Sequence, residues 1–327
     1  MKIGIVFAGQ GAQYSGMGKD LYESYPQAKE IFDMAGEQVK EWCFEGDEET
    51  LKQTHVTQPA IYTTTMAAYE ALKAEMSQQG LDDKLEVTAL AGFSLGEYSA
   101  LTAAGTIDEI AKGIDIVSKR GVLMQQAGLD EEGNPKGGMA AGIGERESIL
   151  EAVEAAREDG ILEGVNFNSP VQTVVAGDKA ALKRFRRAAK ERRVKAIPLE
   201  VSTAFHSPMM VPAAEKLKEV LTAAELKEPN KKVYANVTAE DMMKDHDGSN
   251  AAIYLTEMLA KQAMSPVYWE EIIKRFESDG VEAIVEVGPG KTLTGLTKKT
   301  CPEITALNVE NVETLTETIK TLKKMVQ

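Results

Sequence analysis

The residues best placed to do chemistry lie in Gly92-Phe93-Ser94-Leu95-Gly96, a segment with the pattern G-x-S-x-G. A strand-like apolar run over residues 87–91 precedes it directly, and a helical pattern follows it directly. Small residues on both sides of a serine allow a sharp turn that exposes the hydroxyl, and the amides that open the helix can stabilise an oxyanion. Ser94 is therefore a candidate nucleophile, although a plain structural turn would use the same residue types.

A serine hydroxyl needs a base before it can attack a carbonyl, and histidine is the usual base. The chain contains only His55, His206 and His246. His246 lies in a polar loop and His55 leads into a helix, whereas His206 follows the last strand of a predicted small subdomain, where the chain returns to the large domain. We predict that His206 is the general base for Ser94; the alternative is a histidine satisfied in the core.

The elements that position these residues alternate between strands and helices, which predicts an α/β protein with a mostly parallel sheet, similar to the α/β-hydrolase arrangement. Strands are predicted at residues 3–7, 87–91, 233–237, 283–287 and 305–309. Amphipathic helices are predicted at 19–39, 61–76 after Pro59, 95–104 and 108–127, and from residues 211, 251, 267 and 312.

A second pattern interrupts this alternation between residues 137 and 199, in the order strand, helix, strand, strand, helix, strand. Its strands are predicted at 139–143, 161–167, 173–176 and 194–199. This order indicates a ferredoxin-like α+β subdomain inserted in the large domain. We therefore predict a large catalytic domain of residues 1–130 and 203–327 and a subdomain of residues 131–202.

Composition excludes several classes of function. The formal charge is −14, with 51 acidic and 37 basic residues, which disfavours a general role on nucleic acid or anionic membranes. Cys43 and Cys301 belong to no C-x-x-C pair, so neither a disulfide framework nor a zinc site is expected. No apolar run is long enough to span a membrane. These features predict a soluble, cytoplasmic protein.

Two glycine-rich segments fail as nucleotide-binding motifs. Gly290-Lys291-Thr292 would need a glycine at position 285 to form a phosphate loop, and that residue is Val285. Gly9-Gln10-Gly11 would need a third glycine at position 14, which is Tyr14.

Six short segments, spread in order from residue 5 to about 300, together resemble the malonyl-CoA:acyl-carrier-protein transacylases. They are Gly9-Gln10-Gly11-Ala12-Gln13, Gly92-Phe93-Ser94-Leu95-Gly96-Glu97-Tyr98, Arg120-Gly121, Asn166-Phe167-Asn168-Ser169-Pro170, Ala204-Phe205-His206 and Gly288-Pro289-Gly290-Lys291-Thr292-Leu293. The joint match is far more specific than any single segment.

The resemblance implies that Ser94 accepts the malonyl group of malonyl-CoA as an ester and that the pantetheine thiol of acyl carrier protein then removes it. It implies that His206 is the base and that the backbone carbonyl of Gln262 orients it. It further implies an oxyanion hole formed by the amides of Gln10 and Leu95. No permanently bound cofactor and no metal are expected.

The resemblance also assigns the malonyl carboxylate to Arg120, which makes physical sense because a planar guanidinium meets a carboxylate with two parallel hydrogen bonds. A charge on a helix surface is the alternative. Phe205, just before His206, is typical of the form that selects malonyl over methylmalonyl. This chain departs from the family at Phe93, where histidine is common, and at Ala8, where proline is frequent.

The segment 183–195 carries eight cations in thirteen residues of an otherwise acidic chain. Since carrier proteins of this kind are acidic, we predict that this helix helps to dock one; a solvated helix face is the alternative. The candidate docking residues are Lys183, Arg184, Arg186, Arg187 and Lys190.

Three questions stay open at this point. A serine thioesterase or other hydrolase of the same architecture would share the nucleophile and base, and a non-catalytic carrier-binding protein would share the fold. The pathway, fatty-acid or polyketide synthesis, is not indicated. We expect a monomer.

Overall fold

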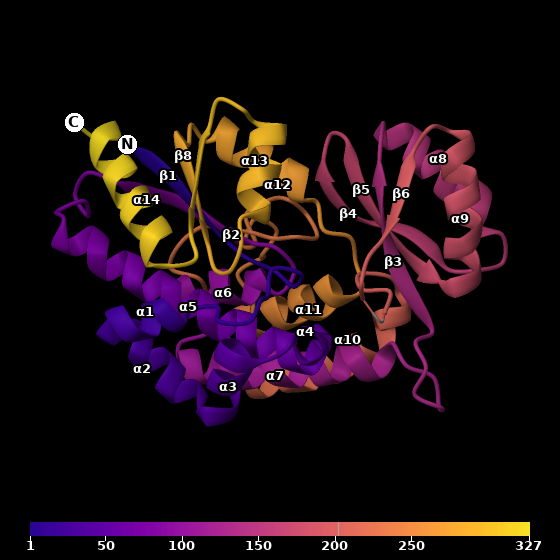
Figure 1. Cartoon of the computed structure of the whole chain (residues 1–327), viewed down its shortest axis with the longest axis horizontal. Coiled ribbons are helices and arrows are strands. Elements are labelled where there is room, and N and C mark those ends of the chain that lie inside the picture. The colour runs from indigo at the N-terminus through magenta and orange to yellow at the C-terminus, as the bar shows by residue number, and fades with distance from the viewer. Residues whose placement is uncertain (202) are drawn as a thin grey trace.

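The computed structural model describes residues 1–201 and 203–327 and contains two β-sheets that lie side by side (Figure 1). The larger sheet is parallel throughout, with the strand order β7-β2-β1-β8-β9. Its strands are β1 (Lys2–Phe7), β2 (Glu86–Gly92), β7 (Val233–Tyr234), β8 (Ala283–Val287) and β9 (Thr305–Val309). The predicted α/β class is confirmed, and four strands lie within one residue of their predicted bounds; β7 ends three residues early.

Helices cover both faces of this sheet because its strands are apolar on both faces. Ile3, Ile5 and Phe7 of β1 face a core shared with α5 (Thr54–Gln78) and α14 (Val312–Met325). Val6 points the other way, into a core shared with α12 (Trp269–Ser278) and α13 (Thr292–Thr300). The alternation follows from the two-residue period of a strand.

Most of the other helices begin within two residues of the predicted positions. They are α6 (Gly96–Ala103), α7 (Ile110–Ala127), α10 (Val211–Ala223) and α11 (Ala251–Ala263). Helix α13 was not predicted, because its N-cap residue is Lys291, which is not a residue type that caps helices and makes no side-chain cap. Glu286 of β8 accepts hydrogen bonds from the amides of Leu293 and Thr294, at 3.0 and 2.6 Å.

The prediction of one helix over residues 19–39 is wrong. The chain forms α1 (Lys19–Ser24), α2 (Pro26–Ala35) and α3 (Glu37–Glu45), followed by α4 (Glu48–Lys52). Tyr25 is extended before Pro26, and Gly36 has φ +87°, so each position ends a helix.

The start predicted for the next helix is also wrong. Helix α5 begins at Thr54, so Pro59 lies inside the helix instead of in its first turn. Most of α5 is buried. The packing gained along the helix outweighs the backbone hydrogen bond that proline removes.

The smaller sheet is antiparallel, with the order β4-β5-β3-β6. Its elements in chain order are β3 (Gly137–Ile143), α8 (Arg146–Arg157), β4 (Leu162–Ser169), β5 (Gln172–Asp178), α9 (Lys179–Glu191) and β6 (Lys195–Pro198). This is the predicted ferredoxin-like order. Both helices pack on one face of the sheet. The domain boundary near residue 130 stays a prediction, and residue 202 lies outside the described residues.

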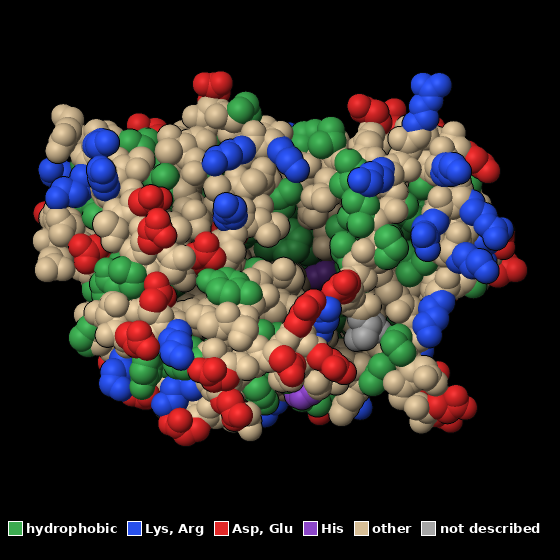
Figure 2. Space-filling model, in the orientation of Figure 1, with side chains coloured by type: hydrophobic (Ala, Val, Ile, Leu, Met, Phe, Trp, Pro, Cys, Tyr) green, Lys and Arg blue, Asp and Glu red, His purple; other side chains and the backbone are tan. Residues whose placement is uncertain are grey.

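The two sheets and their helices enclose a hollow that opens on the molecular surface (Figure 2). Among the described residues, no helix is both long and apolar enough to cross a bilayer.

Candidate active site

Ser94 stands at a sharp turn between β2 and α6. Its φ is +51°, a left-handed conformation that is strained for a residue with a side chain. A Cβ atom on Gly92 would lie 1.9 Å from the backbone of Gly96, and one on Gly96 would lie 2.2 Å from the carbonyl oxygen of Phe7. Both positions therefore require glycine, because the turn folds α6 against the end of β2 and against β1.

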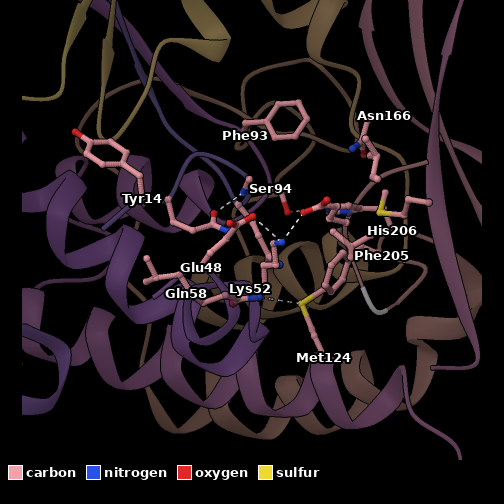
Figure 3. A pocket seen from close by; sticks show the side chains of 18 of the residues that line it. Tyr14, Glu48, Lys52, Gln58, Phe93, Ser94, Met124, Asn166, Phe205 and His206 are labelled. Carbon is pink, nitrogen blue, oxygen red and sulfur yellow. Dashed lines mark hydrogen bonds and ion pairs between the residues drawn. The ribbon is translucent and has the colours of Figure 1, made fainter. Parts of the chain in front are cut away.

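His206 lies beside this serine although the two residues are far apart in the sequence (Figure 3). Its Nε2 is 2.7 Å from Ser94 Oγ. Its Nδ1 lies 2.9 Å from the carbonyl oxygen of Gln262 and 3.1 Å from that of Ser265. Because carbonyl oxygens only accept, Nδ1 must carry the proton, which leaves the lone pair of Nε2 facing the serine hydroxyl.

The environment of His206 keeps its imidazole neutral. The ring is buried, and burial, together with the positive charge of Arg120, lowers its pKa from 6.5 to about 4. The hydrogen bonds to the two carbonyl oxygens raise the pKa of His206, but less than burial and Arg120 lower it. The site can therefore supply an unprotonated base at neutral pH.

Arg120 projects from α7 into the same space and is 1% exposed. Its Nη1 donates to Gln58 Oε1 at 2.9 Å, and its Nη2 donates to Gln262 Oε1 at 3.1 Å. The same Nη2 is 3.5 Å from Ser94 Oγ, and the guanidinium lies over the Tyr98 ring at 5.1 Å.

No carboxylate of the described residues forms an ion pair with Arg120, and its Nε–H has no hydrogen-bond partner among them. A buried guanidinium without a counter-ion is costly. It therefore forms a ready site for an anionic group next to the serine.

Gln10 and Leu95, the two predicted oxyanion-hole residues, belong to segments that meet at the turn of Ser94. Gln10 lies in the loop after β1, and this loop packs so closely on the turn that a Cβ on Gly9 would lie 2.4 Å from the carbonyl oxygen of Phe93. Leu95 opens α6. Neither the Gln10 amide nor the Leu95 amide donates a hydrogen bond to another described residue, and Gln10 lines the cavity.

The hollow above Ser94 has a volume of about 660 Å³, within the range of small-molecule sites. It lies between the two sheets, and Figure 3 shows His206 and Asn166 on one side of Ser94 and Tyr14 on the other. A smaller cavity of about 220 Å³ adjoins it and shares Gln10, Phe93 and Asn166 with it.

Phe93 forms an apolar part of this wall. Its ring packs edge-on against Trp269 of α12, with ring centroids 5.4 Å apart. A histidine at this position would place a polar ring there; the phenylalanine instead extends the apolar core of α12 and α13 to the edge of the cavity.

Sequence reasoning missed two polar residues that hold the site. Gln58 accepts from Arg120, as described above, and Asn236 accepts a hydrogen bond from the amide of Ser94 at 2.8 Å. Both are fully buried. For Asn236 the available signal was a polar residue within the apolar stretch of residues 233–237. Gln58 stands among polar residues in the sequence, so its burial in α5 gave no such signal.

The structure brings Ser94, His206, Arg120 and Gln262 together and leaves the other histidines elsewhere. His55 bonds to Gln125 Oε1 at 3.0 Å, and His246 bonds to the carbonyl oxygen of Ser249 at 3.1 Å.

The cations lie on α9, which covers the face of the smaller sheet that is turned away from the parallel sheet (Figures 1 and 2). Arg184 is held internally by the carbonyl oxygens of Ala156 and Arg157. The other four candidates form no ion pair with a described residue; they are Lys183, Arg186, Arg187 and Lys190.

A serine–histidine pair at a strand-to-helix turn, beside a parallel sheet and under an inserted antiparallel sheet, defines the class of acyl-transferring α/β enzymes. A family model described as "Acyl transferase domain" matches residues 5–327. The chain is 40% identical over 330 residues to the malonyl CoA-acyl carrier protein transacylase of Bacillus subtilis, covering 99% of this chain and 98% of that protein.

Solved structures agree with these sequence comparisons. The malonyl CoA-acyl carrier protein transacylase of Clostridium perfringens superposes with a TM-score of 0.89 at 37% identity, covering 99% of this chain and 98% of that one. A malonyl-transacylase in complex with its type II polyketide synthase acyl-carrier protein superposes with a TM-score of 0.88 at 35% identity, covering 98% and 100%. The chain belongs to the malonyl-CoA:acyl-carrier-protein transacylase family, which confirms the resemblance inferred from its motifs.

Proposed function

We propose that this enzyme moves a malonyl group from coenzyme A to the pantetheine thiol of acyl carrier protein through an ester on Ser94. The proposal rests on the groups that surround one atom, Ser94 Oγ. It lies 2.7 Å from the unprotonated Nε2 of His206 and 3.5 Å from the Arg120 guanidinium. The first neighbour activates the oxygen, and the second selects an acyl group that carries a negative charge.

The first half-reaction transfers the acyl group to the enzyme. His206 Nε2 takes the hydroxyl proton as Ser94 Oγ bonds to the thioester carbonyl carbon, and the carbonyl oxygen becomes an oxyanion. The amides of Gln10 and Leu95 stabilise that oxyanion. The carbon–sulfur bond then breaks, and the imidazolium returns its proton to the coenzyme A sulfur.

The second half-reaction follows the same path in reverse with a different thiol. His206 takes the proton of the carrier's pantetheine thiol, and the sulfur attacks the ester carbonyl. The carbon–oxygen bond to Ser94 breaks, and the proton passes to Ser94 Oγ. Gln262 supports both halves, since its backbone carbonyl fixes His206 and its side chain fixes Arg120. The chain's own side chains and amides carry every step, so the reaction needs no permanently bound cofactor.

The experiment that tests this function compares two acceptors. Enzyme pre-loaded with labelled malonyl-CoA is freed of coenzyme A and then given either holo-acyl carrier protein or buffer alone. We expect rapid appearance of label on the carrier and much slower release of free malonate. A hydrolase would release malonate at a similar rate with and without the carrier, and a non-catalytic carrier-binding protein would never take up the label.

We also propose that the four cations of α9 without ion partners help to attract an acidic carrier. Long-range attraction fits their position, since α9 is separated from the cavity by the width of the smaller sheet. Reversing Arg186 and Arg187 to glutamate should weaken the salt dependence of the apparent KM for the carrier and leave the KM for malonyl-CoA unchanged. An unchanged salt dependence contradicts the docking proposal. The same reversal at Lys216 of α10 and Lys320 of α14, two exposed lysines without an ion pair to a described residue, is the control.

A cytoplasmic location is part of this proposal, because Cys43 and Cys301 are buried free thiols that suit a reducing compartment. A monomeric state stays a prediction. The enzyme's place in fatty-acid or polyketide synthesis depends on which carrier it meets.

A further inference from the structure

Asn236 is bonded through all four of its polar groups and is fully buried. Its Oδ1 accepts from the amide of Ser94 at 2.8 Å, and its Nδ2 donates to the carbonyl oxygen of Gly92 at 2.7 Å. Its backbone amide donates to Glu97 Oε1 at 2.8 Å, and its backbone carbonyl accepts from the amide of Tyr268 at 2.9 Å. One residue thus contacts both sides of the nucleophile's turn and two neighbouring elements.

The position of Asn236 follows from the sheet. Strand β7 pairs with β2 through only two residues, Val233 with Leu90 and Tyr234 with Ala91. Because parallel strands end at the same edge, the chain that continues from β7 runs beside the turn that follows β2. Asn236 is two residues beyond the end of β7 and so reaches Gly92 and Ser94.

The contacts of Asn236 connect the segment that positions Ser94 with the segment that positions His206. The turn at Ser94 has φ +51°, a conformation that persists only where the surroundings enforce it. The carboxamide of Asn236 bridges that turn. Its backbone carbonyl holds the amide of Tyr268, shortly after Gln262 and Ser265, whose carbonyl oxygens fix Nδ1 of His206.

We propose that Asn236 is a positioning residue for acyl transfer, which holds the turn so that Ser94 Oγ meets His206 Nε2. The inference rests on the proposed function, since it concerns the same serine. Without the carboxamide, the Ser94 amide and the Gly92 carbonyl lose buried partners and the turn relaxes. Because a small misplacement of reacting atoms is costly, the rate constant of acylation should fall about ten- to a hundredfold.

Glu97 provides the anchor on α6. Its Oε1 accepts from the Asn236 amide, and its Oε2 has no partner among the described residues. Burial raises the pKa of this carboxyl to about 7. Oε1 can accept whether or not Oε2 is protonated, so Glu97→Gln should acylate at nearly the normal rate, whereas Glu97→Ala should be slow.

The test measures acylation by labelled malonyl-CoA in a rapid-quench instrument, and it separates the rate constant from the amplitude. For Asn236→Ala we expect a reduced rate constant with a normal amplitude, because every folded molecule is acylated slowly. A purely structural role would give the opposite, a normal rate constant with a reduced amplitude. Asn308→Ala is the matched control, since Asn308 lies on β9 of the same sheet, away from Ser94.

A second variant decides the matter if Asn236→Ala fails to fold. Asn236→Asp keeps an oxygen for the Ser94 amide, and its neutral carboxyl can donate to the Gly92 carbonyl, whereas its carboxylate cannot. The acylation rate relative to the unmodified enzyme should therefore be highest at low pH and fall as pH rises. A ratio that does not change with pH, or a normal rate in both variants, overturns the inference. Failure of the unmodified enzyme to acylate would instead overturn the proposed function.

Discussion

Replacement of Arg120 by alanine gives the sharpest view of how this site selects its acyl group. The guanidinium is buried, has no carboxylate partner among the described residues, and places Nη2 3.5 Å from the nucleophilic oxygen. Nη2 is therefore the donor that an arriving carboxylate would meet beside the serine. A hydrogen bond to a charged group contributes about 1.5–3 kcal/mol. At about 1.36 kcal/mol per factor of ten, Arg120→Ala should slow acylation by malonyl-CoA about ten- to a hundredfold.

The substitution also disturbs the site itself, and the assay must separate that effect. Gln58 and Gln262 each lose a donor, and the Gln262 side chain also donates to the Ser94 carbonyl at 2.7 Å. Acetyl-CoA reports this disturbance, since its acyl group has no carboxylate. The acylation rate with malonyl-CoA divided by the rate with acetyl-CoA removes the general disturbance, and this ratio should fall about ten- to a hundredfold.

Lys119→Ala is the matched control, because Lys119 is the neighbouring cation on α7 and points to solvent, where it pairs with Asp115. Its ratio of malonyl to acetyl acylation should stay unchanged. Equal losses with both thioesters in Arg120→Ala would refute the assignment of the carboxylate to this guanidinium.

Three further predictions follow from the same geometry. The rate of acylation by acetyl-CoA should stay level as pH falls to about 5 and decline through about 4, where His206 becomes protonated; a midpoint at pH 6.5 would contradict the pKa shift. Because the unfolded chain already binds that proton near pH 6.5, the free energy of unfolding should also decrease as pH falls from 6.5 to 4. Gly92→Ala, whose Cβ would lie 1.9 Å from Gly96, should lose about 3 kcal/mol or more of unfolding free energy in denaturant titrations, and normal stability would contradict the packing of the turn. Phe205→Ala should raise the rate with methylmalonyl-CoA relative to malonyl-CoA about tenfold, because the ring lines the cavity; an unchanged ratio would remove Phe205 from selectivity.

Local patterns were sufficient for much of the fold. The period of two in the strands and the turn residues around them located all nine strands of the described residues to within three residues, and the order of elements predicted both sheets. Errors arose where helices were closely spaced. Residues 19–39 read as one amphipathic stretch, because the breaks before Pro26 and at Gly36 leave the apolar spacing almost intact.

Some residues of the candidate site could likewise be predicted from local sequence, and others could not. Ser94 could be predicted because the G-x-S-x-G turn is a local feature, and His206 could be predicted because only three histidines compete. Asn236 contacts Ser94 across 142 positions of sequence, and Gln58 contacts Arg120 across 62. Those contacts depend on how β7 pairs with β2 and how α5 packs on α7, which no single segment specifies.

The most direct test of the proposed chemistry is mass spectrometry of the protein after brief exposure to malonyl-CoA, followed by peptide mapping. We predict one malonyl group on the peptide that contains Ser94, none on the Ser94→Ala variant, and much slower labelling of His206→Ala. A malonyl group bound to another residue, or undiminished labelling of Ser94→Ala, would contradict the mechanism.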